Sequence, residues 1–425
     1  DQPWATAVAV RGPRIAYVGG DEGARDYVGQ ATEVIDLDGR MLMPGFHDSH
    51  MHPMTAGTRF LRCRLHGLAW PDEVLEKIAE CGEEEQAESW FRGVGLADEV
   101  FEGTGPHRSV LDDLVPHRPA FITNESGYLA WLNTAALEAA GIGPNTPDPE
   151  KGRIERDPRT GEPIGVLRHN AAGMVYSLIP PPAAAELRKA LALASELANS
   201  LGITSCNAAK VWPAHHEAYV QANRAGEMTL RVQASLRWDP DHGPGQLDAL
   251  IRRRDEAPGN RYRADAIKLT LDGGFQRRTA ALLEPYSGTP EDRGNLYVGP
   301  AVLHELIRRL DGADFQVHVH AVGDRATREA LDALAHAAEA NGPRDRRHHL
   351  AHIVLIDPDD LPRFARLGIA ADYQALWAYL SPGMQIEVEA LGPDRAQRLI
   401  QIRSMLDTGA RVVAGSDWIS ESMSP

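Results

Sequence analysis

From Gly202 onward, short apolar runs alternate with longer segments in which apolar residues recur every three or four positions. The short runs predict buried parallel strands, and the longer segments predict amphipathic helices. The predicted strands begin near residues 203, 230, 266, 315, 349, 369 and 412, and one more leads into His50. Eight strands with seven helices between them predict an α/β fold, a distorted (β/α)8 TIM barrel that lacks its last helix.

The pattern differs on either side of the first predicted barrel strand. Residues 4–43 hold a few short strand-like runs, the last two at 34–36 and 41–43, which are too few to form a core alone. We therefore expect residues 1–43 to be the N-terminal part of a small composite β-sandwich, and residues 44–425 to be the barrel domain. Within that domain, residues 54–182 alternate unevenly and predict a large insertion that carries substrate contacts.

The first predicted strand runs into His50-Met51-His52. Side chains two apart in a strand point the same way, so His50 and His52 can hold one metal ion. A His-x-His pair also occurs by chance, and the interpretation depends on residues farther along the chain. Polar residues at or near the ends of four later apolar runs lie where barrel enzymes carry their site residues. They are Lys268, His320, His352 and Asp417.

Lys268 stands inside the apolar run 266–270, where a lysine is costly to bury. Its ammonium would repel a metal cation, so three interpretations stay open. Lys268 could pair with a buried carboxylate, or it could be carbamylated by CO₂ into an anionic ligand that bridges two metals. It could also form a Schiff base in an isomerase or aldolase, but such an enzyme has no need of His-x-His.

Charge and composition exclude several classes of function. The 425-residue chain has a formal net charge of −16, from 44 basic and 60 acidic residues, which argues against nucleic-acid binding. No apolar run approaches the roughly 20 residues of a membrane span. The three scattered cysteines indicate neither a disulfide framework nor a thiolate zinc site, so we expect a reducing, cytoplasmic location. Both ends look cut, so a lost signal peptide stays open.

A set of motifs spread over the chain resembles the amidohydrolase superfamily. The match is best to its family-3 branch, the YtcJ-like and N-substituted formamide deformylase-like proteins, and it covers essentially the whole sequence. The motifs are Pro44-Gly45-Phe46, Asp48-Ser49-His50-Met51-His52, Asn133–Leu137, Gly165–Leu167, Ile267-Lys268, Ala280–Tyr286, His320–Ala326, His352 and Gly415-Ser416-Asp417-Trp418.

The resemblance implies a centre of one or two divalent metals, zinc being expected. One metal would be held by His50, His52 and Asp417. The second would be held by His320 and His352, with carboxylated Lys268 as the bridge. The resemblance also implies that a C-terminal segment, apparently missing here, completes the sandwich.

We therefore expect a metal-dependent amidohydrolase or deacylase that cleaves a non-peptide C–N bond of a small molecule by metal-activated hydroxide. Asp417 is the expected catalytic residue, which accepts a proton from water and passes it to the leaving nitrogen. The alternatives are hydrolysis of esters or cyclic amides, and a catalytically inactive binding or regulatory homologue. No nucleic-acid or membrane partner is expected, and the sandwich edges favour a homodimer.

Three further residues are candidates for substrate contacts. Tyr128 stands where the family-3 branch usually has histidine, which bears on specificity. Asp272 follows the Lys268 strand and would shape the pocket, unless it belongs to a plain turn. Trp377 and Tyr128 could line an apolar pocket or simply pack. His318 shares a strand face with His320, and we interpret it as supporting a ligand rather than as a ligand.

Overall fold

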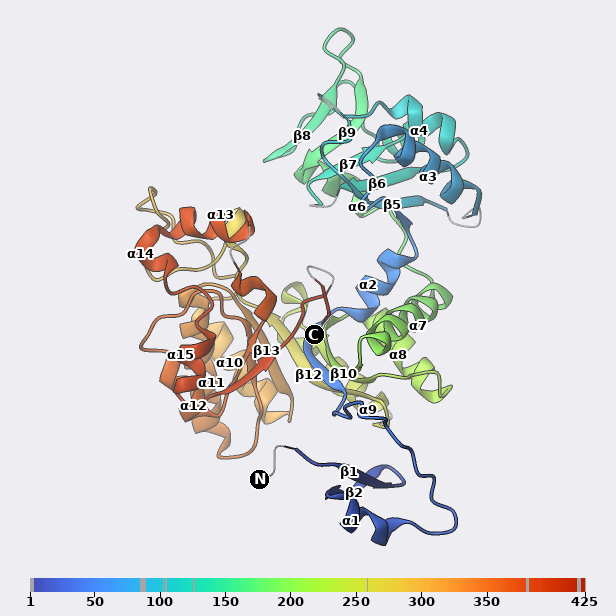
Figure 1. Ribbon diagram of the computed structural model, residues 1–425. Coiled ribbons are helices and arrows are strands. Elements are labelled where there is room, and N and C mark those ends of the chain that lie inside the picture. The colour runs from blue at the N-terminus through green and yellow to red at the C-terminus, as the bar shows by residue number, and fades with distance from the viewer. Residues whose placement is uncertain are drawn as a thin grey trace. The chain divides into compact units, whose positions relative to one another are not determined.

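The computed structural model describes residues 4–84, 89–101, 103, 105–124, 127–257, 259–379, 382–418 and 422–424. The chain divides into two compact units, residues 1–45 and residues 46–425 (Figure 1). Each unit is described by itself. None of the described helices combines the length and the apolar character that crossing a membrane would need.

The first unit is built on one antiparallel pair of strands, β1 (Ala7–Arg11) and β2 (Arg14–Gly19). They are followed by α1 (Asp21–Ala24) and the 3₁₀ turn η1 (Arg25–Tyr27). The strands expected at 34–36 and 41–43 are absent, and this prediction was wrong. Ile35 and Met41 stay about 70% exposed, because an apolar run becomes a strand only where a partner strand pairs with it. The composite sandwich stays a prediction.

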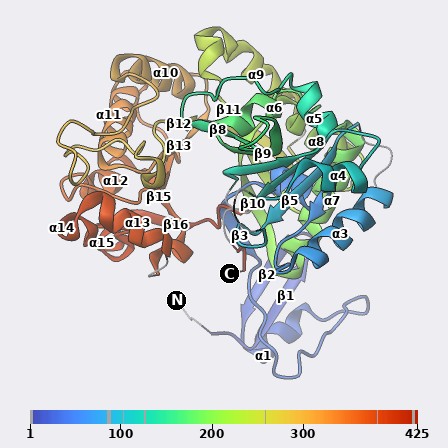
Figure 2. The ribbon, with the colours of Figure 1, turned by 90° about the horizontal axis from the view of Figure 1, so that it is seen from above.

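Eight parallel strands in the second unit form a nearly closed barrel (Figures 1 and 2). The hydrogen-bonded order runs from β16 back through β15, β14, β13, β12, β11 and β10 to β3. The predicted α/β barrel is therefore confirmed. The strands are β3 (Phe46–Met51), β10 (Ile203–Val211), β11 (Arg231–Arg237), β12 (Tyr262–Thr270), β13 (Gln316–Ala321), β14 (His349–His352), β15 (Ala370–Tyr373) and β16 (Arg411–Ala414).

Strands β16 and β3 stand at the two ends of this order, and the segment after β16 is hydrogen-bonded to the end of β3. The backbone N–H of Asp417 donates to the carbonyl of His50 at 2.7 Å, and that of His52 donates to the carbonyl of Trp418 at 2.8 Å. Gly415 makes the approach possible, because a Cβ there would lie 2.5 Å from the Cβ of His50. The carboxylate after the last strand is thus held beside the histidines of the first.

Helices pack against the barrel strands, and Figure 2 shows α10 to α12 outside strands β12 to β15. The helix expected at 395–408 is broken in two, because Ile400 between its halves adopts a left-handed φ of 48°. The helices are α2 (Pro53–Phe60), α7 (Ala184–Ser200), α8 (Pro213–Arg224), α9 (Leu247–Glu256), α10 (Pro300–Gly312), α11 (Asp324–Asn341), α12 (Leu361–Leu367), α13 (Pro382–Leu391), α14 (Pro393–Ala396) and α15 (Ile402–Asp407). The 3₁₀ turns are η3 (Pro240–Gln246), η4 (Phe275–Arg277) and η5 (Ala375–Ala378).

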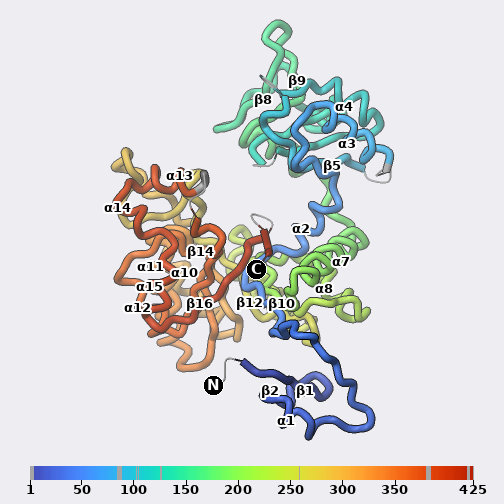
Figure 3. The backbone as a smooth tube through the Cα atoms, viewed as in Figure 1, coloured from blue at the N-terminus to red at the C-terminus, as the bar shows by residue number. Residues whose placement is uncertain are grey.

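Between α2 and α7 the chain forms a separate six-stranded mixed sheet, and Figure 3 shows the path of the backbone from α2 through this sheet to α7. Its order is β4-β5-β6-β7-β9-β8. Along β6, Phe121 and Ile122 point to opposite faces, and each belongs to a different buried apolar cluster. The strands are β4 (Cys63–Arg64), β5 (Phe91–Leu96), β6 (Ala120–Asn124), β7 (Leu129–Leu132), β8 (Gly152–Arg156) and β9 (Pro163–His169).

Helices supply the other half of both apolar clusters of this inserted sheet. Val74 and Leu111 belong to the cluster of Ile122, whereas Leu137 and Val175 belong to the cluster of Phe121. The inserted sheet therefore has its own core on each face. Its helical segments are α3 (Pro71–Glu84), α4 (Arg108–Leu114), α5 (Thr134–Ala139), η2 (Asn170–Ala172) and α6 (Gly173–Tyr176).

A disulfide joins Cys63 of β4 to Cys81 of α3, with their Cα atoms 5.7 Å apart. The sequence had indicated no disulfide. A separation of 18 residues does not by itself indicate a disulfide, because the bond forms only where the fold brings the two Cβ atoms close together. Cys206, in β10, is buried and free.

Candidate metal centre

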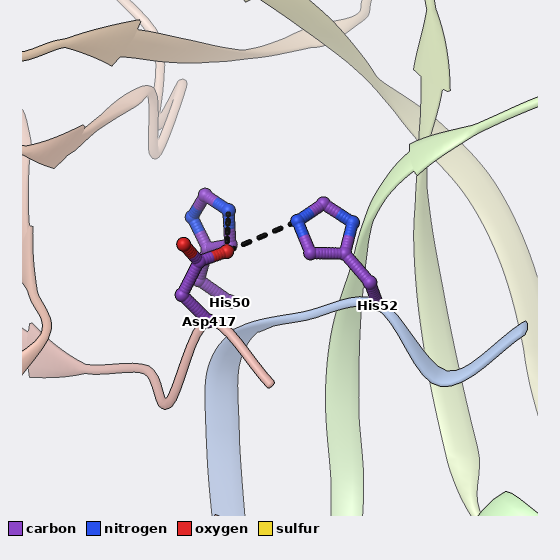
Figure 4. Close-up of side chains that lie close together, drawn as sticks. All are labelled: His50, His52 and Asp417. Carbon is purple, nitrogen blue, oxygen red and sulfur yellow. Dashed lines mark hydrogen bonds and ion pairs between the residues drawn. The ribbon is translucent and has the colours of Figure 1, made fainter. Parts of the chain in front are cut away.

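His50, His52 and Asp417 meet at the carboxyl end of the first strand (Figure 4). The Oδ1 atom of Asp417 lies 3.0 Å from His52 Nε2 and 3.4 Å from His50 Nε2. His52 lies just past β3, as the residue that precedes α2, rather than in the strand. The two imidazoles therefore converge through the turn of the chain as well as through strand alternation.

The hydrogen bond on the far side of His52 decides which ring atom faces Asp417. Its Nδ1 lies 2.8 Å from the carbonyl oxygen of Ala209, which can only accept. Nδ1 must therefore carry the hydrogen, and the lone pair of Nε2 faces Asp417 Oδ1. Two acceptors 3.0 Å apart need a cation between them, either a proton or a metal ion.

A chain of buried hydrogen bonds sets the orientation of His50. The Ser235 hydroxyl lies 2.9 Å from both Asn207 Oδ1 and His318 Nδ1. The Asn207 oxygen only accepts, so Ser235 donates to it and accepts the N–H of His318. His318 Nε2 can then accept from His50 Nδ1, 3.1 Å away. This leaves the His50 Nε2 lone pair directed at Asp417, with His318 bonded to the other nitrogen of the His50 ring.

Lys268 lies deep in the barrel among imidazoles. Its Nζ is 3.0 Å from His318 Nε2 and 3.3 Å from His50 Nε2. Within the described ranges, no carboxylate lies in ion-pair distance of this nitrogen, which argues against the buried-pair interpretation. Burial lowers the pKa of Lys268 to about 7, although the charges of Asp417 and Asp372 act in the opposite direction.

His320 and His352 lie side by side, with ring centroids 4.4 Å apart. The Nδ1 of His352 lies 2.7 Å from Gln374 Oε1, so it donates there and its Nε2 keeps a lone pair. Trp377 stacks on the His352 ring at 5.4 Å and 8°. His352 also holds a φ of 81°, a strained conformation of the kind that persists at functional sites.

The buried Nε2 of His320 has no hydrogen-bond partner among the residues that the structure describes. Its closest carboxylate atom is Asp272 Oδ1, at 3.8 Å. A buried polar atom with no partner calls for an explanation, and a bound ion is one of the ordinary ones. His320 and His352 thus offer a second pair of imidazoles beside the first three residues.

Burial keeps the imidazoles of His50, His320 and His352 neutral at pH 7. It lowers the pKa of His50 and His320 well below the usual 6.5, and that of His352 to about 4. Burial pushes the pKa of Asp417 upward, but a proton shared with His52, together with nearby positive charge, outweighs burial and holds that pKa below its usual value. Neutral imidazoles beside an ionised carboxylate are the protonation states that metal ligands need.

Asp372 was not singled out from the sequence, yet its carboxylate lies close to His50 and His318. One oxygen accepts from Ser49 Oγ at 2.9 Å, and the other has no partner among the described residues. Burial raises the pKa of Asp372 to about 8. The available signal was its position, a carboxylate at the end of an apolar run, as for the predicted ligands.

Two acidic residues position the centre without facing it. Asp48 accepts the Ser416 hydroxyl and the backbone N–H of His50, and so ties the Asp417 loop to β3. Asp272 is fully buried and accepts backbone N–H groups of Ala281, Val322 and Gly323 at 2.9–3.0 Å. The substrate contact of Asp272 stays a prediction, and its Oδ1 atom lies 3.8 Å from His320 Nε2.

The other two candidate substrate residues lie apart from each other. Trp377 covers a face of the ligand candidate His352. Tyr128 belongs to the inserted sheet, 5.6 Å from the His169 ring, and it contacts Arg277 of η4. The structure thus brings the six predicted ligands to the carboxyl end of the barrel, and places Tyr128 on the insertion.

A model of the amidohydrolase family matches residues 33–425. The chain belongs to this family. The Bacillus subtilis protein named "Putative amidohydrolase YtcJ" is 30% identical over 94% of this chain and 74% of its own length. The N-substituted formamide deformylase of Arthrobacter pascens is 30% identical over 99% of this chain and 78% of its own length. The family predicted from the motifs is confirmed.

Among solved structures, an uncharacterized metal-dependent hydrolase from Pyrococcus furiosus matches the fold with a TM-score of 0.80 and 25% identity. The match covers 98% of this chain and 82% of that one. Family membership, this likeness and the converging histidine and aspartate side chains together support a metal-dependent hydrolase.

Proposed function

We propose that this amidohydrolase cleaves a non-peptide, amide-like C–N bond of a small molecule. The observation that carries the proposal is the convergence of His50, His52 and Asp417, whose lone pairs face one another at the carboxyl end of the barrel. Such a donor set is costly without a cation, and it suits zinc or a related divalent metal.

The residues fit one metal at that group and a second beside it. His320 and His352 would hold the second, since one has a buried Nε2 without a partner and the other an oriented Nε2 lone pair. Carboxylated Lys268 would bridge the two. Its amine would bond to the carbon of CO₂ and release a proton, giving an anionic carbamate in place of a cation. The absence of a carboxylate partner near its Nζ within the described residues favours this state.

A divalent cation at this position supplies a hydrolytic nucleophile near neutral pH and polarises the scissile carbonyl. The carboxylate of Asp417 accepts the proton of the attacking water, and then gives it to the leaving nitrogen. Its depressed pKa keeps it ionised and ready as the base. His50 and His52 stay fixed through the step, because their far nitrogens bond to His318 and Ala209. Trp377 would form an apolar wall against the substrate.

The name of one relative supports the proposed bond class. That relative is an N-substituted formamide deformylase, so formamides with a substituted nitrogen are the first compounds to test. Esters and cyclic amides present the same carbonyl to the same nucleophile, and they form the comparison set. Deacylation of an N-acyl amine is the reaction we expect.

The test uses the full chain, stripped by a chelator and reloaded with zinc. Hydrolysis is measured as acid and amine release from N-substituted formamides and N-acetyl amines, as ring opening of cyclic amides, and as acid and alcohol release from esters of matched size. We expect the amides to be hydrolysed with zinc present, and the rate to fall in Asp417→Asn. Faster hydrolysis of the esters or cyclic amides would move the assignment to those bonds. A folded, zinc-loaded protein that hydrolyses none of the four would contradict the proposal.

A further inference from the structure

The inserted sheet carries a cavity of about 380 Å³, within the range of small-molecule pockets. Its lining comes from the end of β5, the segment after it, and the ends of β6, β7 and β9 that lie closest to that segment. The side chains used below are Leu96, Asp98, Phe101, Asn124, Tyr128, Leu129 and Arg168.

The topology puts all of these residues at one edge of the sheet. Strands β5 and β6 are parallel, so Leu96 and Asn124 at their carboxyl ends share that edge. Strand β7 is antiparallel to β6, and β9 is antiparallel to β7, so the start of β7 at Leu129 and the end of β9 at Arg168 lie there too. A crevice outside the carboxyl ends of parallel strands is where such sheets bind ligands.

Apolar side chains lie beside one oriented carboxylate in this cavity, that of Asp98, which is exposed to solvent. Leu96, Phe101 and Leu129 supply the apolar surface. Asn124 donates its Nδ2–H to Asp98 Oδ1 at 2.7 Å, and it accepts the backbone N–H of Leu129 at 2.9 Å. The first of these bonds orients Asp98, and its second oxygen has no hydrogen-bond or ion-pair partner among the described residues. That oxygen is the acceptor the cavity offers.

The cationic side chain of the cavity already has its counter-charge. Arg168 donates through Nε to Glu155 Oε1 at 2.8 Å, and Glu155 is buried. Arg153 approaches the other oxygen of Glu155 at 3.0 Å from the surface. Arg168 thus has a buried counter-ion, whereas the Arg153 side chain is exposed to water, and Asp98 is the carboxylate that a ligand in the cavity meets. A positively charged group fits best.

The cavity also adjoins the segment that leaves the metal centre. Arg277 of η4 follows β12, the strand that carries Lys268. Its guanidinium lies 5.3 Å from the ring centroid of Tyr128, and its Nε is 3.5 Å from the Tyr128 hydroxyl. Tyr128 thus belongs both to the cavity wall and to a contact with the segment downstream of Lys268.

We propose that this cavity binds the non-reacting part of the substrate, a ring-sized apolar group that carries a protonated amine. The ring packs against Leu96, Phe101 and Leu129, and the ammonium donates to Asp98. The substrate class is then an amide that bears a second, basic nitrogen on an apolar body. The inference rests on the proposed function for the reaction, while the binding itself needs no metal.

The test compares benzylamine with benzyl alcohol, its uncharged counterpart, binding to the full chain at pH 7 after metal removal. Calorimetry or ligand-observed NMR measures the two dissociation constants. We expect benzylamine to bind about 10-fold or more tightly than the alcohol, as a charge-assisted hydrogen bond gives. Asp98→Asn should weaken benzylamine about 10-fold and leave the alcohol unchanged.

A matched control is Asp113→Asn, which removes an equal charge from an exposed position on α4. It should change neither dissociation constant. Equal binding of the two probes, no binding of benzylamine, or the same loss in Asp113→Asn would overturn the inference. Because these measurements use metal-free protein, their outcome is independent of hydrolysis. An inactive enzyme with an intact benzylamine site would sink the proposed function alone.

Discussion

Two buried polar clusters lie in the same barrel, and they differ in whether their charges are matched. At the amino ends of β13 and β14, fully buried Asp311 accepts from Asn341, Arg344 and Arg346 at 2.6–2.8 Å. His348 takes the backbone N–H of Val317 on Nδ1, so its Nε2–H donates to Asp311. Every donor there meets an acceptor.

At the carboxyl ends of the strands, by contrast, several polar atoms lack a hydrogen-bond partner of the right kind. His52 Nε2 and Asp417 Oδ1 face each other as two acceptors, and His320 Nε2 and Asp372 Oδ2 have no partner among the described residues. A complete network stabilises a fold by itself, whereas an incomplete one is retained for what it binds. The difference separates a structural cluster from a functional one within one scaffold, in keeping with the division of roles between barrel ends.

The largest expected effect comes from the incomplete cluster. Asp417→Asn removes the base, so kcat for the amide substrate should fall by about 10²–10⁴-fold. The metal-free variant should remain as stable as the wild type, because the mutation removes a carboxylate that faced a lone pair. Steady-state kinetics and thermal unfolding check both parts. Retained turnover, or a large loss of metal-free stability, would place Asp417 with the structural cluster.

The complete cluster should respond in the opposite way. Asp311→Asn leaves two arginines without their buried counter-charge, and the free energy of unfolding should fall by about 3–5 kcal/mol. The control is Asp314→Asn, whose exposed carboxylate pairs with the same Arg344 and should contribute only about 0–1 kcal/mol. Denaturant titration of both variants measures the difference. Equal losses of unfolding free energy in the two variants would mean that the buried Asp311 contributes no more than the exposed Asp314.

A smaller effect is expected from the hydrogen-bond chain that orients His50. Ser235→Ala interrupts the link from Asn207 to His318, and metal affinity should fall about 10–100-fold. Nitrogen NMR of the metal-free protein should show mixed His50 tautomers. Ser205→Ala removes a similar hydroxyl that bonds to His47, and it should leave the affinity unchanged. An unaltered tautomer in Ser235→Ala would contradict the assigned direction of the chain.

The two clusters should also give opposite pH dependences. Burial raises the pKa of Asp372 to about 8, so between pH 4 and 8 the unfolded chain is ionised there and the folded one is protonated. Asp372 therefore costs the fold stability as pH rises, by at most about 1.4 kcal/mol per pH unit, and nothing further above pH 8. The gain in stability of Asp372→Asn over wild type should grow across this window. A constant difference would exclude the raised pKa.

Asp311 supplies the contrast in sign. Burial raises its pKa, but the four side-chain donors outweigh burial and hold the pKa well below its usual value. Its contribution to stability is thus present above pH 4, and is lost only as pH falls toward the folded-state pKa. The loss in Asp311→Asn should stay constant from pH 5 to 8. A stability loss in Asp311→Asn that changed between pH 5 and 8 would contradict the lowered pKa of Asp311.

The sequence was informative wherever local pattern decides structure. Runs such as Ala266–Thr270 become barrel strands because both of their faces are buried, and ligand candidates at strand ends converge because parallel strands end together. Lys268 was recognisable for the same reason, as a charge inside an apolar run. These signals were enough to predict the barrel and the set of residues that meet at its carboxyl end.

What the sequence did not reveal depends on long-range partners. The apolar positions at 34–36 form no strand because no strand pairs with them in the first unit. Asp372 joins His318 only through the register of three neighbouring strands, and the pairing of Cys63 with Cys81 depends on how β4 meets α3. The unpartnered atoms of the centre could be recognised only after every hydrogen-bond partner was known.

The metal content of the purified full-length protein tests the central claim most directly. Elemental analysis of wild type and His50→Ala, with circular dichroism to show that both are folded, gives the number of ions per chain. The account predicts about one or two divalent ions per chain in wild type and their loss in His50→Ala. A folded wild-type protein that holds no metal, and takes up none when zinc is added, would contradict it.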